Sequence, residues 1–481
     1  MINFRIIARI YGLMLIFEGI MMLAAAGISY FLKDPAASSL LFSGLITITA
    51  GVFVYTPVKG DEQLYSNREG FLIITGTFLI YIITGMLPYL LSGTIKNITD
   101  AFFESASGFT TTGATILNSI DSLPRGIVLW RSLTQWIGGL GIIFLSLYVL
   151  PVFKDNIIQL STTDFSGQPQ DKIYPRWVDT AKRLISLYII LTILEALFLA
   201  AGGMNLFDAA CISLSTLSTG GFSPHNYSLT LLTAPYAKIV ITLFMFLGGT
   251  NMAIIYYLYK RNLQKIKENR EFIYYLVLSL AFCLVVSGLL MVQKHPFSES
   301  VINGSFHVIS IITTTGFYTN DYTQWGNFIL LLLFILMFTG GTVGSASGGI
   351  KIARLMTLGI NTRMEIKRLI HPDAYLPVRI NRKIIPQEIV YNILVFVTIY
   401  FIIICSSAFI FSLMNYDIIT SFSTAASILA NIGPAIGEFG PLTTYSSLPV
   451  AGKWFMSFLM ILGRLEMLAV MVLFARSFFR K

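Results

Sequence analysis

The chain has 481 residues, of which 55% are hydrophobic and only 12% are charged, and its mean hydropathy is +0.73. A soluble core of this length does not need so many apolar residues, so lipid is the expected solvent. The formal net charge of +9 does not mark a nucleic-acid-binding surface, because the basic residues lie in short segments between apolar runs rather than in one stripe.

The first apolar run extends to about residue 32 and follows Arg5 and Arg9. It contains an Ala-Ala-Ala-Gly stretch that could serve as a signal-peptidase site. However, roughly twenty apolar residues match a bilayer span, whereas the apolar region of a signal peptide has about 7 to 15. We therefore expect a retained first helix rather than a cleaved leader.

Ten apolar segments are long enough to cross a bilayer. They lie at residues 8–32, 38–57, 70–93, 126–150, 179–203, 233–259, 272–293, 325–355, 385–414 and 450–477. With the N-terminus placed in the cytoplasm, 25 of the 33 Lys and Arg residues fall inside and seven outside, and Arg464 is left within the membrane. This excess of positive charge on the inside predicts that both termini are cytoplasmic.

Four shorter and less apolar segments lie between paired spans and align without a gap. They cover residues 100–113, 208–221, 303–316 and 420–433, and each ends in glycine. Each begins with a candidate helix N-cap: Asp100, Asp208, Asn303 and Thr420. Each has a serine six residues before the final glycine: Ser107, Ser215, Ser310 and Ser427. The pattern predicts a short helix followed by a loop, repeated four times.

These four loops predict a pore, because irregular backbone at membrane depth is tolerated only where protein shields it or where it lines water. A cation entering a narrow passage needs oxygens to replace its hydration water, and a ring of backbone carbonyls supplies them. Glycine at the end of each loop permits positive φ angles, so that successive carbonyls can face one axis. The alternative is that small residues only let helices pack closely, and it does not explain four matching copies.

The expected fold is an all-α polytopic membrane protein with four tandem repeats of helix, pore helix, loop and helix around a central pore. Two additional helices precede the repeats. The predicted divisions are 1–60 for the N-terminal extension and 61–153, 154–263, 264–370 and 371–481 for the four repeats. The fourth loop lacks the threonine pair of the others, so the side chains around the ring should be asymmetric.

The second span of the third repeat is interrupted by residues 339–350, which contain five glycines. They are Gly340, Gly341, Gly344, Gly348 and Gly349. A helix does not stay intact through so many glycines at this depth. We expect a mobile gate here, and the alternative is a packing kink.

Arg464 lies near the middle of the last span, where an unpaired charge costs a few kcal/mol or more. Its side chain should therefore face the pore interior, or else form a buried ion pair with a residue such as Glu195. Two acidic residues near the outer vestibule, Glu104 and Asp208, could either attract cations or orient the pore helices.

The loop sequences TTTGAT, STGGFSPHN, TTTGFYTND and NIGPAIG resemble the four filter sequences of the Trk/Ktr/HKT superfamily of potassium transporters. The resemblance extends over essentially the whole chain, and the two extra N-terminal helices are similar to those of the Trk-type membrane subunit. It implies a filter for K⁺ formed by Thr111, Thr112, Gly113, Thr219, Gly220, Gly221, Thr314, Thr315, Gly316, Asn431, Ile432 and Gly433. It also implies that the loop 339–350 is a gate beneath this filter and that Arg464 is a constriction residue there.

The resemblance further implies partners and a location. These are a second copy of the chain in a homodimer, a soluble nucleotide-binding Trk regulatory subunit on the cytoplasmic face, and the prokaryotic inner membrane. Serine at the position of Gly113 is associated with sodium-permeable plant members, so glycine here implies selectivity for potassium. The residues by themselves imply only a monovalent cation.

We therefore expect potassium uptake that is driven by the membrane potential and gated from the cytoplasmic side. A symporter that couples K⁺ to Na⁺ or H⁺ is an open alternative. No organic cofactor is expected, because the chain has no GxGxxG or P-loop motif in a suitable context. No enzymatic activity is expected, because the four histidines are scattered without the spacing of metal ligands.

Overall fold

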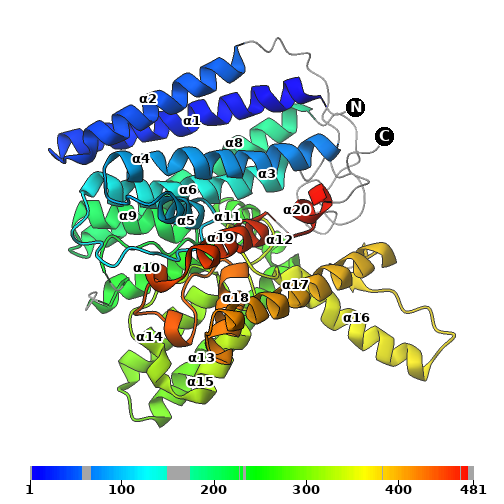
Figure 1. Cartoon of the computed structure of the whole chain (residues 1–481). Coiled ribbons are helices and arrows are strands. Elements are labelled where there is room, and N and C mark those ends of the chain that lie inside the picture. The colour runs from blue at the N-terminus through cyan, green and yellow to red at the C-terminus, as the bar shows by residue number, and fades with distance from the viewer. Residues whose placement is uncertain are drawn as a thin grey trace.

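The computed structural model describes residues 3–56, 67–148, 174–226, 228–230, 234–381, 383–465 and 467–474 (Figure 1). Within these ranges the protein is helical apart from one antiparallel hairpin of two-residue strands, β1 (Arg379–Ile380) and β2 (Lys383–Ile384). The predicted all-α architecture is confirmed. The predicted domain boundaries near residues 60 and 153 lie outside the described residues.

The N-terminal half begins with a pair of long antiparallel helices, α1 and α2, along one edge of the molecule (Figure 1). The side chain of Asn3 caps α1 by accepting a hydrogen bond from the amide of Arg5. The helices of this half are α1 (Phe4–Phe31), α2 (Ala36–Tyr55), α3 (Asn67–Gly85), α4 (Leu87–Leu91), α5 (Ile98–Phe109), α6 (Arg125–Tyr148), α8 (Tyr174–Ala201), α9 (Leu206–Leu217), α10 (Pro235–Gly248) and α11 (Met252–Tyr259).

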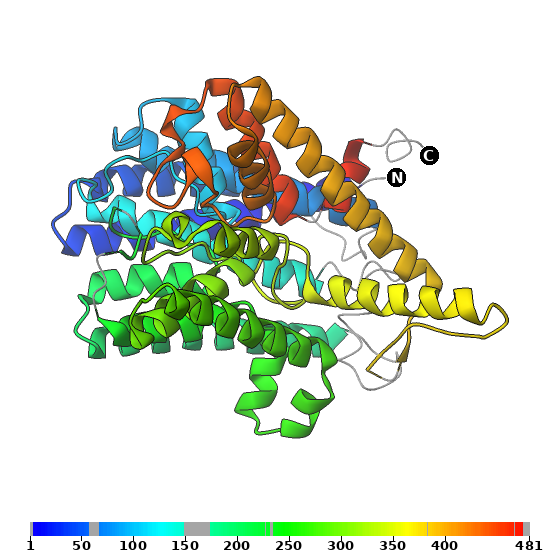
Figure 2. The ribbon, with the colours of Figure 1, turned by 90° about the horizontal axis from the view of Figure 1, so that it is seen from below.

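The C-terminal half repeats the alternation of long and short helices. Its α16 and the β hairpin project at the end of the molecule where α1 begins and α20 ends (Figures 1 and 2). The elements are α12 (Leu263–Glu268), α13 (Arg270–Val292), α14 (Phe297–Ile312), η1 (Tyr322–Trp325), α15 (Asn327–Leu336), α16 (Ile352–Ile370), α17 (Gln387–Leu413), α18 (Ile418–Leu429), η2 (Gly437–Phe439), η3 (Tyr445–Ser447), α19 (Val450–Arg464) and α20 (Met467–Phe474).

Six of the described helical stretches are long and apolar enough to cross a membrane unaided. They are Phe4–Phe31, Ala36–Tyr55, Arg68–Leu91, Ala181–Ala201, Arg270–Val292 and Gln387–Leu413. They comprise the two N-terminal helices and the first helix of each predicted repeat. The second helix of each repeat is different, because it is either polar on its buried face, as α6 is, or broken in the middle.

Three of these second helices are interrupted. The axis bends by 110° between α10 and α11, α15 is separated from α16 by residues 337–351, and α19 ends at Arg464 just before α20. Only the second of these breaks was predicted from the sequence, and the segments 233–259 and 450–477 were predicted to cross without any break being expected in them. At the first break Gly248 and Gly249 are poor helix formers, and Asn251 begins a new helix by accepting the amide of Ala253 at 2.8 Å.

The four short helices α5, α9, α14 and α18 lie among the longer ones, and their C-terminal halves are buried. Their predicted N-caps are wrong by three residues or more. In α5, α9 and α18 the capping side chains belong to Asn97, Asn205 and Asp417, while α14 starts after Pro296. Asp100 and Asp208 lie instead in the first turn, where the helix dipole also favours a carboxylate.

Candidate functional site

The C-terminal ends of the four short helices lead into four loops, which we name loop A (110–114), loop B (218–222), loop C (313–317) and loop D (430–434). Each loop repeats one backbone pattern. Its second residue has a positive φ between 50° and 57°, at Thr111, Thr219, Thr314 and Asn431. Its fourth residue is a glycine with φ between 77° and 99°, at Gly113, Gly221, Gly316 and Gly433.

Three of these positive φ angles occur at threonine, which is rare for a β-branched residue. Such strain costs about 1–3 kcal/mol per residue and is maintained only where the surroundings enforce it, typically at functional sites. Because the same conformation occurs at the same place in all four loops, it is a common structural property of the site and not a distortion of one loop.

The four loops close into a ring. A methyl group placed on the glycine of one loop would lie within 3.0 Å of a carbonyl oxygen in the next loop, so only glycine fits. The contacts are Gly113 with Gly220, Gly221 with Thr315, Gly316 with Ile432, and Gly433 with Thr112. The loops therefore contact one another in the order A, B, C, D and back to A, and together they contain all twelve sequence-predicted filter residues.

The position of the serine shared by the four short helices has a structural role that the sequence did not reveal, and this role uses the backbone rather than the serine side chain. Its backbone carbonyl accepts the amide of the third residue of the following loop, at 2.8 to 2.9 Å in all four copies. The pairs are Ser107 with Thr112, Ser215 with Gly220, Ser310 with Thr315, and Ser427 with Ile432. This bond turns the chain sharply out of the helix and into the loop.

Most carbonyl groups of the ring have no partner. Within the described part of the chain, the twelve predicted filter residues offer twelve backbone carbonyls, and only those of Gly220 and Gly433 accept a hydrogen bond. The large majority of buried carbonyls in proteins are paired, and eight of these ten unpaired carbonyls belong to buried residues, so they call for an explanation. A dehydrated cation is a chemically suitable partner, because it binds several carbonyl oxygens at once.

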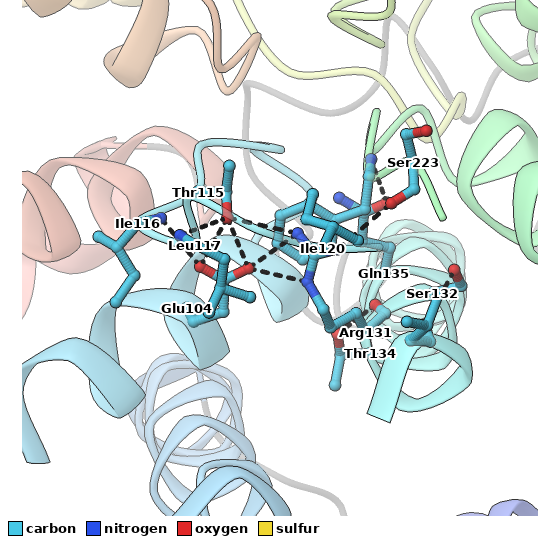
Figure 3. A network of polar contacts seen from close by, with 12 residues as sticks. Glu104, Thr115, Ile116, Leu117, Ile120, Arg131, Ser132, Thr134, Gln135 and Ser223 are labelled. Atoms are coloured by element: carbon cyan, nitrogen blue, oxygen red, sulfur yellow. Dashed lines mark hydrogen bonds and ion pairs between the residues drawn. The ribbon is translucent and has the colours of Figure 1, made fainter. Parts of the chain in front are cut away.

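A buried ion pair supports loops A and B from behind (Figure 3). Arg131 of α6 donates to the carboxylate of Glu104 at 2.9 Å, and both side chains are almost fully buried. Glu104 also accepts the hydroxyl of Thr115 and the amide of Ile116, just after loop A. Arg131 in turn reaches the carbonyl of Ser223 just after loop B. Glu104 therefore orients the loops and does not face the outer vestibule.

Another α6 side chain, that of Gln135, holds loop B directly. It donates to the carbonyl of Gly220 at 2.7 Å and accepts the amide of Phe222 at 3.0 Å. Sequence reasoning did not identify Gln135 or Arg131 as site residues. A polar cluster within an otherwise apolar span was the available signal, because such residues inside a membrane usually have a function.

The glycine-rich segment 339–350 forms a loop against one side of the ring. A parallel bridge joins Thr339 to Ile350 at its base. Near its end, the amide of Gly348 donates to the hydroxyl of Thr314 in loop C at 2.7 Å, and the Cα of Gly348 lies against the carbonyl of Ala430 in loop D. The structure thus brings one of the predicted gate glycines, Gly348, into direct contact with the predicted filter.

The bend between α10 and α11 holds the tip of this glycine-rich loop. The amide of Thr342 donates to the carbonyl of Gly249 at 3.0 Å, and the amide of Ala346 donates to the carbonyl of Gly248 at 3.3 Å. The broken helix therefore supplies the carbonyls that the loop backbone needs. The sequence carried a signal for this bend, because Gly248-Gly249-Thr250 has the same three residues as Gly340-Gly341-Thr342.

Arg464 ties the glycine-rich loop to two other parts of the chain. Its guanidinium donates to the carbonyl of Ala346 at 2.6 Å and to that of Gly138 at 3.4 Å, and the side chain is buried. The alternative ion pair with Glu195 does not form. Among the described residues Arg464 has no carboxylate partner, and both carboxylate oxygens of Glu195 lack a hydrogen bond.

A histidine links the segments that follow loops A and B to each other and to helix α9. The two ring nitrogens of His225 face Asp121 at 2.9 Å and Asp208 at 3.2 Å. Burial by itself would lower the pKa of His225, but the hydrogen bonds and charges of the two carboxylates outweigh it and raise the pKa above the usual 6.5. The protonated imidazole can donate to both carboxylates at once, whereas the neutral form cannot.

Replacing His225 with glutamine should therefore destabilise the protein in a pH-dependent way. Folding raises the pKa of His225, so the protonated side chain stabilises the folded state. This stabilisation is fully present at a pH below the unfolded pKa of 6.5, and it is lost as the pH rises through the higher folded pKa. We expect a lower melting temperature for His225→Gln at about pH 5.5 and no difference at about pH 9. A difference that is equal at both pH values would contradict the assignment of the charged form.

The described residues contain no group of three or more His, Cys, Asp or Glu side chains that could hold a metal ion. The oxygens concentrated at the site are backbone carbonyls and threonine hydroxyls. Such neutral oxygens suit a weakly held monovalent cation better than a tightly bound divalent one, which prefers carboxylates or imidazoles.

Comparison with known proteins agrees with this geometry. A family model described as "Cation transport protein" (TrkH) matches residues 40–481. The chain is 33% identical over 487 residues to the Trk system potassium uptake protein TrkH of Escherichia coli K12, with 100% of both chains covered. It is 33% identical over 484 residues to the protein of the same name from Halomonas elongata, again with 100% of both chains covered.

The fold has a close counterpart among solved structures. The crystal structure of the potassium transporter TrkH from Vibrio parahaemolyticus matches with a TM-score of 0.91 and 30% sequence identity, and 100% of both chains is covered. Together with the apolar helices, these relatives identify an integral membrane protein. The resemblance noted in the sequence to Trk-type membrane subunits is confirmed, and the chain belongs to the TrkH family of cation transport proteins.

Proposed function

We propose that this protein takes up potassium ions across the membrane through the ring formed by loops A to D. The observation that carries the proposal is the closed ring of unpaired and largely buried backbone carbonyls contributed by four matching loops. The names of the relatives, potassium uptake proteins and a potassium transporter, support the choice of ion. K⁺ is then the transported substrate, and no organic cofactor is required.

In this proposal the twelve filter residues named above replace the hydration shell of the ion with carbonyl oxygens. The four glycines allow neighbouring loops to approach closely enough for several carbonyls to reach one ion. The four short helices direct their C-terminal ends toward the ring, and their partial negative charge favours a cation there.

We further propose that the glycine-rich loop and Arg464 form the gate. The loop contacts loops C and D, and its position depends on hydrogen bonds to Gly248, Gly249 and Arg464. The charge of Arg464 would also raise the barrier for a cation that passes close to it. Opening would require the loop to exchange these hydrogen bonds for others. Besides Arg464, the proposed gate residues are Gly340, Gly341, Gly344, Gly348 and Gly349.

Replacing Arg464 with alanine is expected to increase ungated flux. Hydrogen bonds from a charged group contribute about 1.5–3 kcal/mol, so their loss should raise the population of the open loop roughly tenfold or more. Rubidium uptake into liposomes that contain the variant and no regulatory protein measures the ungated flux. Arg464→Lys, which keeps the charge, is the control. A clear decrease in flux through correctly folded Arg464→Ala would contradict the gate.

Potential-driven flux is the decisive test of the proposed function. Liposomes that contain only the purified protein are given a negative internal potential and no sodium or pH gradient. Accumulation of rubidium in preference to sodium would support a selective channel-like pore. Rubidium uptake that appears only with a sodium or proton gradient would support the coupled symporter, which is the second candidate. No uptake under any gradient would count against a self-sufficient pore.

We also propose where the protein resides and which partners it binds. The chain would reside in a prokaryotic inner membrane with both termini in the cytoplasm, as a homodimer. A soluble nucleotide-binding Trk regulatory subunit would bind the cytoplasmic face. The names of the relatives, which assign them to a Trk system, support a multi-component transporter.

A further inference from the structure

One glycine carbonyl of the ring differs from its three counterparts. The phenol of Tyr445 donates a hydrogen bond of 2.7 Å to the carbonyl of Gly433 in loop D. The corresponding carbonyls of Gly113, Gly221 and Gly316 accept no hydrogen bond from any described residue. We call the four carbonyls of Gly113, Gly221, Gly316 and Gly433 the glycine level of the ring. Three of these four carbonyls are free acceptors, and one already accepts a hydrogen bond.

Tyr445 is fixed independently of loop D. Its side chain is buried, and its ring stacks on Phe439 with the centroids 4.7 Å apart. Its backbone amide donates to the carbonyl of Thr115, just after loop A, at 2.9 Å. The phenol thus occupies a position set by the protein around it, so the carbonyl of Gly433 is oriented toward the phenol rather than left free to turn.

A second buried tyrosine makes a related bond that does not involve a filter residue. The phenol of Tyr322 donates to the carbonyl of Ala435 at 3.0 Å, two residues after Gly433. Tyr322 and Tyr445 are each 3% exposed. The two tyrosines bind the same short segment, residues 433–435 at the end of loop D and just after it, but only Tyr445 engages a carbonyl of the ring.

We propose that Tyr445 is a positioning residue that sets the affinity of the glycine level of the filter by withholding one of its four carbonyls. The inference rests on the proposed function of the ring. Fewer free carbonyls bind a dehydrated cation less tightly, and conduction requires binding weak enough for the ion to leave. At the position of the four glycines, loop D, which lacks the threonine pair, is the loop whose carbonyl is engaged by a side chain from outside the loops, whereas Gln135 engages loop B one residue earlier, at Gly220.

The test compares Tyr445→Phe with Tyr322→Phe as a matched control. Each variant keeps the aromatic ring and loses one buried hydrogen bond to the same segment, so their effects on folding should be similar. For Tyr445→Phe we expect the KM for rubidium uptake to fall about fivefold, the change that one hydrogen bond corresponds to. We also expect a shift in the reversal potential between rubidium and sodium, which does not depend on the amount of folded protein. Tyr322→Phe should change neither quantity.

Three outcomes would overturn the inference. Tyr445→Phe with an unchanged KM and reversal potential would mean that the carbonyl of Gly433 does not contribute to ion binding. Equal shifts in both variants would mean that the tyrosines only brace loop D. A failure of the proposed function is distinguishable from these, because the wild-type protein would then also conduct no rubidium, and that result would overturn both ideas.

Discussion

Replacing Gly113 with serine is expected to reduce the ratio of potassium to sodium permeability by roughly tenfold, the change that 1.4 kcal/mol corresponds to. Gly113 has a φ of 80°, and a side chain there would collide with the carbonyl of Gly220 in loop B. The collision would widen the ring on one side, and a wider ring coordinates the smaller, more strongly hydrated sodium ion with retained water. Reversal potentials in mixed potassium and sodium solutions measure the effect.

Gly203 provides a matched control for this variant. It has a φ of 89°, so serine imposes the same kind of backbone strain, but nothing lies within 4 Å of a side chain added there. Gly203→Ser should therefore leave the permeability ratio unchanged. If Gly113→Ser also left the ratio unchanged while the protein remained folded, Gly113 would have no part in ion selection.

Replacing Arg131 with methionine is expected to destabilise the protein by about 3–5 kcal/mol, because it leaves the buried carboxylate of Glu104 without its counter-charge. The loss should appear as a large drop in melting temperature and in the fraction of protein that remains monodisperse in detergent. Arg125→Met on the exposed start of the same helix α6 is the control, and it should have little effect.

A second substitution separates the charge from the packing. In the double variant Glu104→Gln, Arg131→Met no buried charge is left unpaired, and the glutamine oxygen can still accept the hydrogen bonds from Thr115 and Ile116. We expect the double variant to recover a substantial part of the lost stability. If the double variant were as unstable as Arg131→Met alone, the lost stability would be due to the missing contact of the guanidinium with Phe222, whose ring centroid lies 4.1 Å from the guanidinium carbon.

The parts of the fold that the sequence predicted best are those governed by short-range patterns. Long apolar runs predicted the six long helices, since length and composition alone decide whether a helix can cross lipid. The five glycines in 339–350 predicted a break, because they act on the local backbone. The N-caps were misplaced because Asp100 in the first turn is stabilised by the same helix end as the true cap, Asn97.

The bend at Gly249 was missed for a different reason. A Gly-Gly pair within an apolar run is compatible with a continuous membrane helix when neighbours pack against it. At Gly249 the break is stabilised instead by the glycine-rich loop, whose residues Thr342 and Ala346 lie about ninety positions further along the chain and donate hydrogen bonds to the freed carbonyls. Only the folded chain shows that these two segments meet.

The sequence by itself therefore determined a helical membrane protein, four matching segments that end in glycine, and one interrupted helix, because each depends on residues close together in the chain. The tertiary structure alone decided how the four loops close into a ring, which carbonyls Gln135 and Tyr445 engage, and which groups hold Arg464. Most of these contacts join residues from different repeats, and the bond between Tyr445 and Gly433 joins two loop segments of the fourth repeat. They arise from packing and from the need to pair buried polar groups across the whole molecule, and no local pattern records that need.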